Sequence, residues 1–144
     1  MALIDDADVQ THLPIDLLKV EAVPDDRASC KLDAERIVRG HLTGVIDSAV
    51  LASWATPATT PETIRAIAGR LCAALIYRLR FSQIPGGDPE YAQNKYNEAM
   101  LMLMDIVNGN VELPDIDNAN NMDDSWFWPN NTTDPPKFTM ADQY

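Results

Sequence analysis

Apolar residues recur at three- and four-residue steps in three long stretches of the chain, a period that is typical of an α-helix with one buried face. The first stretch covers residues 30–46 and follows a turn at residues 24–26. The second begins where Thr60 precedes a proline, and the third begins where Asp88 precedes another and ends at Gly109. A capping residue followed by proline is a common helix start, and glycine is common just after a helix end. The pattern therefore predicts three long helices.

A short helix over residues 6–13 is predicted ahead of these three. Asp5 has the character of an N-cap, Asp8 places an acid in the first turn, and a proline follows the last helical residue. Residues 53–61 are rich in alanine, threonine and proline and are predicted to form a loop. No stretch alternates strongly enough to predict a strand. We therefore expect a mostly α fold, a small bundle of about four helices, in residues 1–114.

The apolar stripes also predict which side chains pack in the core. In the helix that begins near residue 60, the stripe consists of Ile64, Ile67, Ala68, Leu71, Cys72, Leu75 and Leu79. In the last helix it consists of Tyr96, Met100, Leu103 and Val107, widened by Ala99, Met104 and Ile106. Met102 is expected on the surface. Gly40 and Gly44 lie four residues apart, which predicts that another backbone packs closely against that face of the first long helix.

Charge is distributed unevenly along the 144 residues, which carry a formal net charge of −11. Residues 1–26 have seven acids and one lysine, residues 27–111 have eight acids and nine bases, and residues 112–144 again have seven acids and one lysine. This excess of acids argues against electrostatic binding of nucleic acid, which requires clustered lysine and arginine. The acidic ends either face a partner or simply keep the chain solvated.

Residues 115–144 are predicted to form an extended, irregular arm. The segment is rich in asparagine, proline and acidic residues and has no helical period, so it buries too little apolar surface to fold alone. It nevertheless contains Trp126, Phe127 and Trp128 in a row. Adjacent aromatic residues are typical anchors of protein interfaces, so we expect the arm to become ordered when it docks on another surface.

No constellation of residues predicts catalysis, a cofactor or a metal. Cys30 and Cys72 lack the paired spacing of a zinc site and are too few for a disulfide framework. The histidines are His12 and His41, and His41 lies eleven residues from Cys30, about 16 Å along a helix and too far to share a metal. A packed or interface role is expected for His41. No nucleophile paired with a base is visible, and neither secretion nor membrane insertion is expected.

Two segments resemble the head-to-tail connector, or adaptor, proteins of tailed bacteriophages. Residues 96–114 resemble the family's final helix, in which Tyr, Ala, Leu and Ile precede a glycine and a closing Leu-Pro. Residues 60–77 are similar to its penultimate helix, and the two opening helices occur in the expected order. The resemblance covers roughly residues 3–114 and depends on hydrophobic pattern and punctuating residues. Residues 48–54 depart from the family, which often has an aromatic residue and Leu-Pro there.

The resemblance implies a structural virion protein without enzymatic activity or cofactor. Such proteins assemble as a ring, typically dodecameric, between the portal protein and further neck or tail components. The ring lines a channel through which DNA passes without sequence-specific binding, and no membrane is involved. The location implied is the neck of the virion, and the host cytoplasm during assembly.

Arginines that stand off the core stripe, and the aromatic residues of the arm, are the candidate interface residues. They are Arg65, Arg70, Arg78, Arg80, Trp126, Phe127 and Trp128. Two alternatives to the connector function stay open. One is another neck or tail-completion protein, such as a stopper or terminator, and the other is a soluble acidic inhibitor of a basic host protein.

Removal of the arm is expected to impair assembly. Truncation after Pro114, and the double substitution Trp126→Ala with Trp128→Ala, both remove the aromatic anchors, so less of the protein should be incorporated into tailed particles. The measurement is the amount of this protein in purified particles by quantitative mass spectrometry. Normal incorporation of both variants, with normal infectivity, would show that the arm is only a solvated tail.

Overall fold

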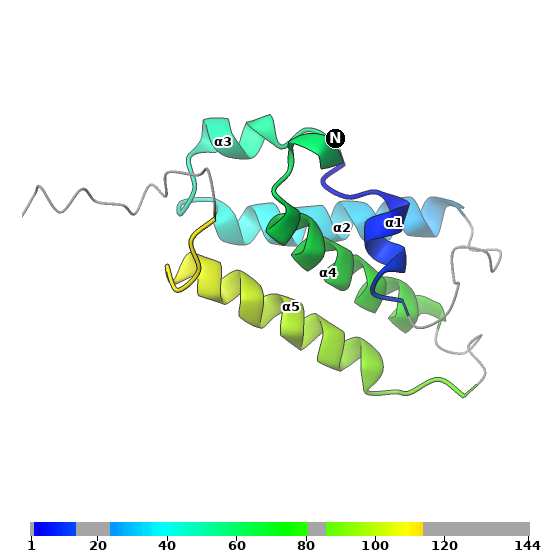
Figure 1. Cartoon of the computed structure of the whole chain (residues 1–144). Coiled ribbons are helices and arrows are strands. Elements are labelled where there is room, and N and C mark those ends of the chain that lie inside the picture. The colour runs from blue at the N-terminus through cyan, green and yellow to red at the C-terminus, as the bar shows by residue number, and fades with distance from the viewer. Residues whose placement is uncertain (1, 14–23, 81–85, 114–144) are drawn as a thin grey trace, which may run out of the picture.

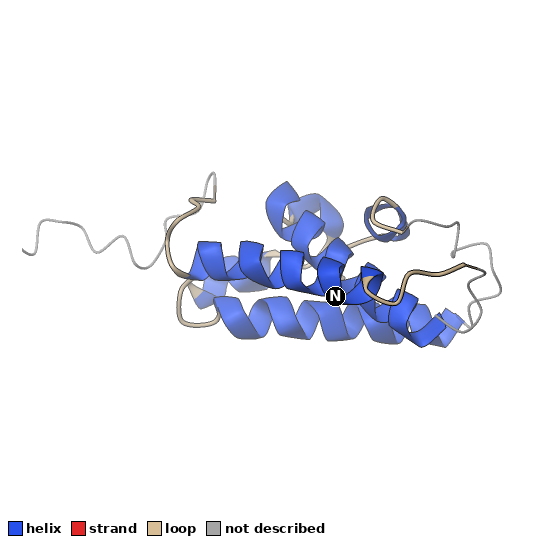
Figure 2. Ribbon diagram, turned by 90° about the horizontal axis from the view of Figure 1, so that it is seen from below, coloured by secondary structure: helices blue, strands red, loops and turns tan. Residues whose placement is uncertain are grey.

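The computed structural model describes residues 2–13, 24–80 and 86–113. Within these ranges the chain forms five α-helices, a short 3-10 helix and no β-strand, so the prediction of a mostly α fold is confirmed. The helices are α1 (Asp6–Gln10), α2 (Pro24–Leu42), α3 (Ser48–Ser53), α4 (Glu62–Arg80) and α5 (Tyr91–Val107), with the 3-10 helix η1 (Pro57–Thr59) before α4 (Figure 1). Figure 2 shows the long helices running along the molecule, joined by loops.

Helix α4 is the centre of the fold. It packs against α1, α2 and α5, and Figure 1 shows it between α2 and α5 with α1 lying across it. Its buried residues are Ile64, Ile67, Ala68, Gly69, Leu71, Cys72, Ala73, Ala74, Ile76 and Tyr77. They lie on several sides of the helix, and half of them have small side chains. Small residues let three helices approach one central helix without leaving voids.

Two helix ends are closed by the residues that the sequence predicts. The Asp5 carboxylate accepts a hydrogen bond from the Asp8 backbone N–H at 2.9 Å, and the Asp8 carboxylate accepts one from the Asp5 N–H at 3.0 Å. These two bonds complete a capping box at the start of α1. At the end of α5, Gly109 has a φ of +75°, and the Asn110 N–H donates to the carbonyl of Asp105 at 2.8 Å. That arrangement is a Schellman motif.

Other predicted helix boundaries differ from the structure. The Asp88 carboxylate accepts a hydrogen bond from the Glu90 N–H at 2.9 Å, and α5 begins one residue after Glu90. The Thr60 hydroxyl, predicted to cap α4, donates to the carbonyl of Thr56 at 2.9 Å. Helix α1 ends at Gln10, three residues before the predicted position. The predicted elements therefore exist, with ends displaced by a few residues.

Gly69 marks the closest approach of α1 to α4. A Cβ atom at this position would lie 2.9 Å from the backbone oxygen of Asp8 and 3.2 Å from Cδ2 of His12. The close packing predicted at Gly40 and Gly44 is wrong, because a Cβ atom at either meets nothing within 4 Å. Gly44 lies beyond the end of α2 and has a φ of +96°. It therefore shapes the turn that leads into α3 and does not form a packing surface.

The sequence pattern does not predict α3, and it extends α2 too far. Helix α2 ends at Leu42, and the six residues of α3 are too few to display a helical period. A start signal is nevertheless present, because the Asp47 carboxylate accepts a hydrogen bond from the Ala49 N–H at 2.7 Å. Leu51 and Trp54 are buried, so these two side chains attach α3 to the core.

Several predicted side-chain positions are wrong. Leu79 is 61 % exposed although its angle falls within the buried arc of α4, because it lies in the last turn of that helix. Met104 is 42 % exposed, whereas Met102, expected on the surface, packs against the core. Of the two roles expected for His41, packing is wrong, because the side chain is exposed with Nδ1 at 2.9 Å from the carbonyl oxygen of Ile37, and the interface role stays a prediction. The apolar stripe predicted for α5 is therefore narrower than the arc of this helix that contacts its neighbours.

The described chain ends at Leu113, whose side chain is buried in the core. The predicted arm, including Trp126, Phe127 and Trp128, lies outside the described residues. Among the helices of the described ranges, none combines the length and the apolar character that crossing a bilayer requires.

The close contact at Gly69 predicts an unusual response to alanine. Gly69→Ala should lower the free energy of unfolding by about 1–3 kcal/mol, because the added methyl group displaces α1 from α4. The matched control is Gly40→Ala, which adds the same methyl group within a helix where nothing lies within 4 Å. The control should be stabilising by up to about 1 kcal/mol. Urea unfolding measures both, and equal effects of the two substitutions would refute the close contact.

Candidate interaction surfaces

Arg65, one of the predicted interface residues, forms an ion pair within the chain. Its Nη2 lies 2.6 Å from Oδ1 of Asp8, and its Nε lies 3.2 Å from Oδ2 of the same carboxylate. This two-bond geometry is the strong form of an arginine–carboxylate pair. Burial raises the pKa of the Asp8 carboxyl, but the hydrogen bonds from Arg65 and Asp5 outweigh it and leave that pKa below its usual value. Arg65 therefore holds α1 on α4.

The acidic N-terminal segment is also paired within the chain. The Asp6 carboxylate forms salt bridges with Lys31 and with Arg27 of α2. Together with the Asp8 pair, these contacts tie α1 to both α2 and α4. Two of the N-terminal acids are thus compensated inside the molecule, and the part of the acidic end that the structure describes is not a free docking surface.

Arg70 is only partly satisfied by the described residues. Its Nη1 contacts the sulfur of Met102 on α5, and its buried Nε has no hydrogen-bond partner among the described residues. A thioether is a weak acceptor. Lys95 of α5 is paired with Glu98 at 2.9 Å, and its charge acts together with that of Arg70 on His12. The same Glu98 carboxylate has its pKa lowered by the hydrogen bond from Lys95 and also by the positive charge of Arg70.

His12 lies within this cluster of charges. Burial lowers the pKa of its imidazole, and the nearby positive charges of Arg70 and Lys95 lower it further, against the opposing effect of two acids, Asp8 and Glu98. The backbone carbonyl of His12 also accepts a hydrogen bond from the hydroxyl of Tyr91 on α5. A shallow groove of about 300 Å³ beside it is lined by Asp8, Thr11, His12, Glu62, Arg65 and Ala66.

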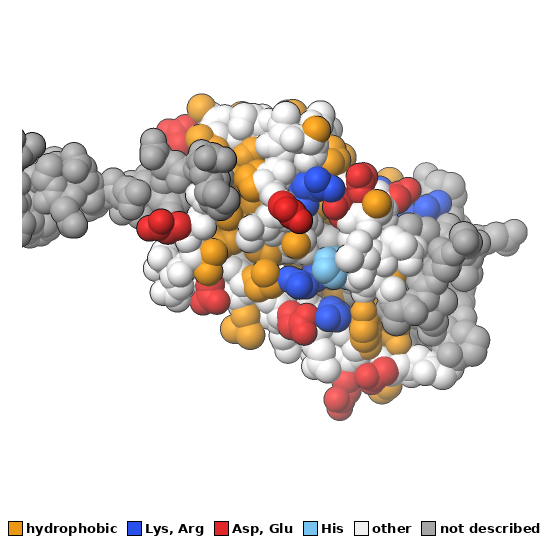
Figure 3. All heavy atoms as spheres, in the orientation of Figure 1, with side chains coloured by type: hydrophobic (Ala, Val, Ile, Leu, Met, Phe, Trp, Pro, Cys, Tyr) orange, Lys and Arg blue, Asp and Glu red, His pale blue; other side chains and the backbone are white. Residues whose placement is uncertain are grey.

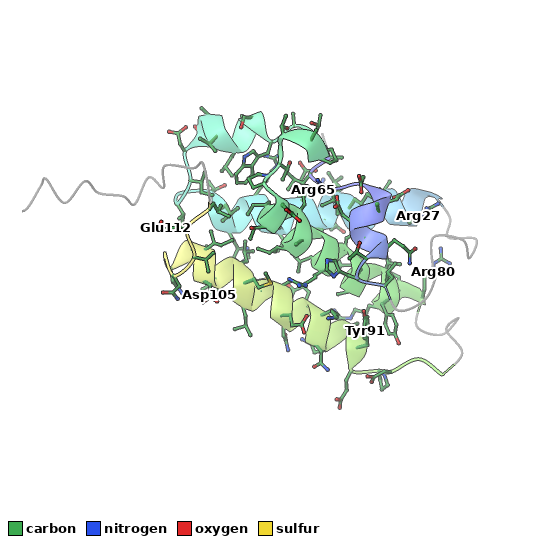
Figure 4. The ribbon with its side chains drawn as sticks, viewed as in Figure 1. Arg27, Arg65, Arg80, Tyr91, Asp105 and Glu112 are labelled. Atoms are coloured by element: carbon green, nitrogen blue, oxygen red, sulfur yellow. The ribbon has the colours of Figure 1, made fainter. Side chains whose placement is uncertain are left out.

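The four predicted arginines do not form one patch. Figure 4 places Arg65 near the start of α4 and Arg80 at its opposite end, fifteen residues apart, or about 22 Å along the helix. Arg65 pairs with Asp8 of α1, Arg70 contacts Met102 of α5, and Arg78 is exposed in the last turn next to Tyr96. The arginines therefore cannot act as a single binding site.

A larger hollow lies between the end of α2 and α3. It measures about 750 Å³ and is lined mainly by apolar atoms of Arg39, Thr43, Gly44, Ile46, Ser48, Leu51 and Ala52. Arg39 forms its framework, since Nη1 donates to the Leu51 carbonyl and Nη2 to the Trp54 carbonyl, both at 2.6 Å. Its Nε donates to the Glu35 carboxylate at 2.9 Å. These bonds cap the C-terminal end of α3.

Exposed apolar side chains occur on several helices. The large ones among the described residues are Leu32, Leu79, Leu101, Met104 and Val111. Leu101 and Met104 are 68 % and 42 % exposed and lie three residues apart on α5, which places them side by side on the helix surface. In Figure 3 hydrophobic side chains gather on the half of the visible face nearer α3, and charged ones gather beside α1.

The described side chains offer little reactive chemistry. Burial, with a smaller contribution from Cys30, raises the pKa of the Cys72 thiol to about 12, so that thiol is not a nucleophile near neutral pH. The described ranges contain no group of three or more histidine, cysteine or acidic side chains placed to hold a metal ion. The features that remain are surfaces: a charged cluster, an apolar hollow and a pair of exposed apolar side chains.

Comparison of the chain with models of protein families, with characterised proteins and with solved structures gives no match. Inference about function therefore depends on the residues of this chain and their geometry.

The environment of His12 predicts that stability falls as the pH drops below about 6.5. Because the folded state lowers the His12 pKa below its unfolded value of about 6.5, the unfolded chain binds the proton more readily. The stabilisation is complete above that value and is lost as the pH falls toward the folded pKa. Urea unfolding between pH 7.5 and 5.5 should show a smaller loss for His12→Gln than for the wild type.

His41→Gln is the matched control for this prediction, because His41 is exposed on α2. It should lose stability over this pH range as the wild type does. If His12→Gln loses as much stability as His41→Gln, the burial of His12 and the charges around it have no effect on the pH dependence of folding.

Proposed function

We propose that this chain is a structural, non-enzymatic protein of a bacteriophage neck, which assembles as a homo-oligomeric ring between the portal and tail components. DNA would pass through the ring without sequence-specific binding. The proposal combines the resemblance of residues 3–114 to connector proteins with the helical bundle and the uncovered apolar surfaces of the folded chain. The protein would be found in the virion neck, and in the host cytoplasm before assembly.

The observation that carries the proposal is the two-sided character of α5. One side of the helix buries Ala99, Leu103 and Ile106 in the core, and the other side exposes Leu101 and Met104. Each square ångström of apolar surface removed from water contributes roughly 25 cal/mol. Adjacent exposed apolar side chains therefore favour association with another protein surface, and copies of the same chain are the partner that an oligomeric ring requires.

The charge balance also suits a conduit for DNA. Several cations of the bundle are already paired with acids, as Arg65 is with Asp8, Arg39 with Glu35, and Lys95 with Glu98. Each phosphate that a protein neutralises adds to its affinity for DNA. Paired cations on a protein with a net charge of −11 would hold a passing duplex weakly, which permits movement.

The two alternatives predict different behaviour. A stopper or terminator shares the class of function and differs only in its place within the neck. An acidic inhibitor of a basic protein would act as a monomer by charge mimicry, with binding that weakens steeply as salt is added. The pairing of Asp6 and Asp8 with basic residues of α2 and α4 leaves such mimicry to other acids, among them the seven of residues 112–144.

The oligomeric state of the full chain tests the proposal. Native mass spectrometry at micromolar concentrations should show one closed oligomer, and electron microscopy of the same sample should show rings with a central opening. Addition of the portal protein that the proposal names as its partner should give a complex that contains both. A protein that stays monomeric at every concentration and does not bind the portal protein would refute the proposal.

A further inference from the structure

His12 lies in the turn after α1, where the N-terminal segment, residues 2–13, meets α4 and α5. Its backbone N–H donates to the Val9 carbonyl at 3.1 Å, and its own carbonyl accepts a hydrogen bond from the Tyr91 hydroxyl. The ring lies against the backbone of α4, since a Cβ atom at Gly69 would be 3.2 Å from Cδ2 of His12. A titratable side chain is therefore part of the contact that holds this segment on two helices.

Charged groups from three helices surround the imidazole. They are Asp8 of α1, Glu62, Arg65 and Arg70 of α4, and Lys95 and Glu98 of α5, and the Tyr91 phenol is a further titratable group in contact with this turn. Figure 3 shows a histidine on this face of the molecule, with basic and acidic side chains around it. The ionic state of His12 therefore affects the contact through these neighbours.

The acids that act on His12 already bind other cations. Asp8 accepts two hydrogen bonds from Arg65, and Glu98 is paired with Lys95 at 2.9 Å. The buried Nε of Arg70 has no hydrogen-bond partner among the described residues. A proton on His12 would thus add a positive charge beside Arg70 and Lys95. Burial, and then the charges of these two residues, hold the pKa of His12 below its usual value.

His12 is the side chain of this cluster that titrates in mildly acid solution. Burial raises the pKa of Asp8, but hydrogen bonds from Arg65 and Asp5 outweigh it and leave that pKa below its usual value. The hydrogen bond from Lys95 lowers the pKa of Glu98. Both carboxylates therefore stay ionised between pH 7.5 and 5.5, a range in which an ordinary histidine, with a pKa of about 6.5, changes charge.

The N-terminal segment can separate from the bundle as one unit. Helix α1 has five residues, too few to persist alone in water, and it lies across α4 (Figure 1). The segment is held by its buried side chains Leu3, Ile4, Val9 and Leu13 and by the ion pairs of Asp6 with Arg27 and Lys31 and of Asp8 with Arg65. Its loss would leave the packing of α4 against α2 and α5 in place.

We propose that the N-terminal segment is an acid-sensitive unit, which protonation of His12 releases from α4 and α5 while the long helices stay packed together. Because the released imidazole regains its usual pKa of about 6.5, the released state binds the proton more readily than the docked state. Release is therefore favoured as the pH falls below that value. The apolar side chains of the segment then become accessible to solvent. This device does not depend on the assembly of a ring.

Hydrogen exchange of the full chain, measured by mass spectrometry on peptides, tests the inference. Protection is the intrinsic exchange rate at a given pH divided by the observed rate. From pH 7.5 to 5.5, the protection of residues 2–13 should fall several-fold, and about tenfold is the upper limit for one proton. Protection of the α4 and α5 amides should stay within about twofold, because these helices do not open with the segment.

Variants of the cluster separate the charge of His12 from its shape. His12→Gln cannot take up the proton, so residues 2–13 should keep their protection at pH 5.5. His41→Gln is the matched control, because His41 is exposed on α2, and it should lose protection as the wild type does. His12→Lys carries a fixed charge and should show weak protection already at pH 7.5. Lys95→Gln keeps the imidazole, removes one cation and frees Glu98, so the loss at pH 5.5 should shrink.

The inference is wrong if residues 2–13 are as well protected at pH 5.5 as at pH 7.5. It is also wrong if His12→Gln loses as much protection as the wild type, because another group then causes the release. Equal loss of protection in residues 2–13, α4 and α5 would show that the proton destabilises the whole bundle and releases no separate segment.

Discussion

The fold depends on the burial of α4 on several sides, and that burial depends on small side chains at the right places. Helices α1, α2 and α5 all pack against it. At Gly69 the backbone of α1 comes so close that even one methyl group would clash with the Asp8 carbonyl. The Arg65–Asp8 pair then fixes the same helix electrostatically. The missing side chain at Gly69 and the Arg65–Asp8 ion pair thus stabilise the same contact, that of α1 with α4. This contact also brings His12 among the charged side chains around it.

Long, strongly periodic segments could be predicted from the sequence, and so could local capping. The capping box of Asp5 and Asp8 and the Schellman glycine Gly109 depend on neighbouring residues alone, which is why local rules are sufficient. Helix α3 could not be predicted, since six residues show no period and its position depends on Arg39, fifteen residues before Trp54. The exposure of Leu79 could not be predicted either, because it reflects where the neighbours of α4 end.

The candidate surfaces were less predictable than the fold. Sequence alone treats the arginines of α4 as equivalent, yet Arg65 is held by Asp8 and Arg70 contacts Met102. His12 joins this cluster from the turn after α1 and Lys95 joins it from α5, and no spacing rule connects residues so far apart in the chain. The hollow at α3 has the same origin. Surfaces built from distant segments require the packing of the whole bundle, whereas helices require only their own residues.

Because one side chain, Arg39, holds the end of α3, this helix is expected to fold and unfold as a single unit. Two carbonyls at the end of that short helix and one carboxylate on α2 share a single guanidinium, and an isolated helix of this length does not persist in water. If those hydrogen bonds break, α3 should open as one unit, as the least protected segments of proteins do in hydrogen exchange. One wall of the hollow would then disappear. The hollow can therefore bind a partner only in the fraction of molecules in which α3 is folded against α2. A partner that fills the hollow increases that fraction.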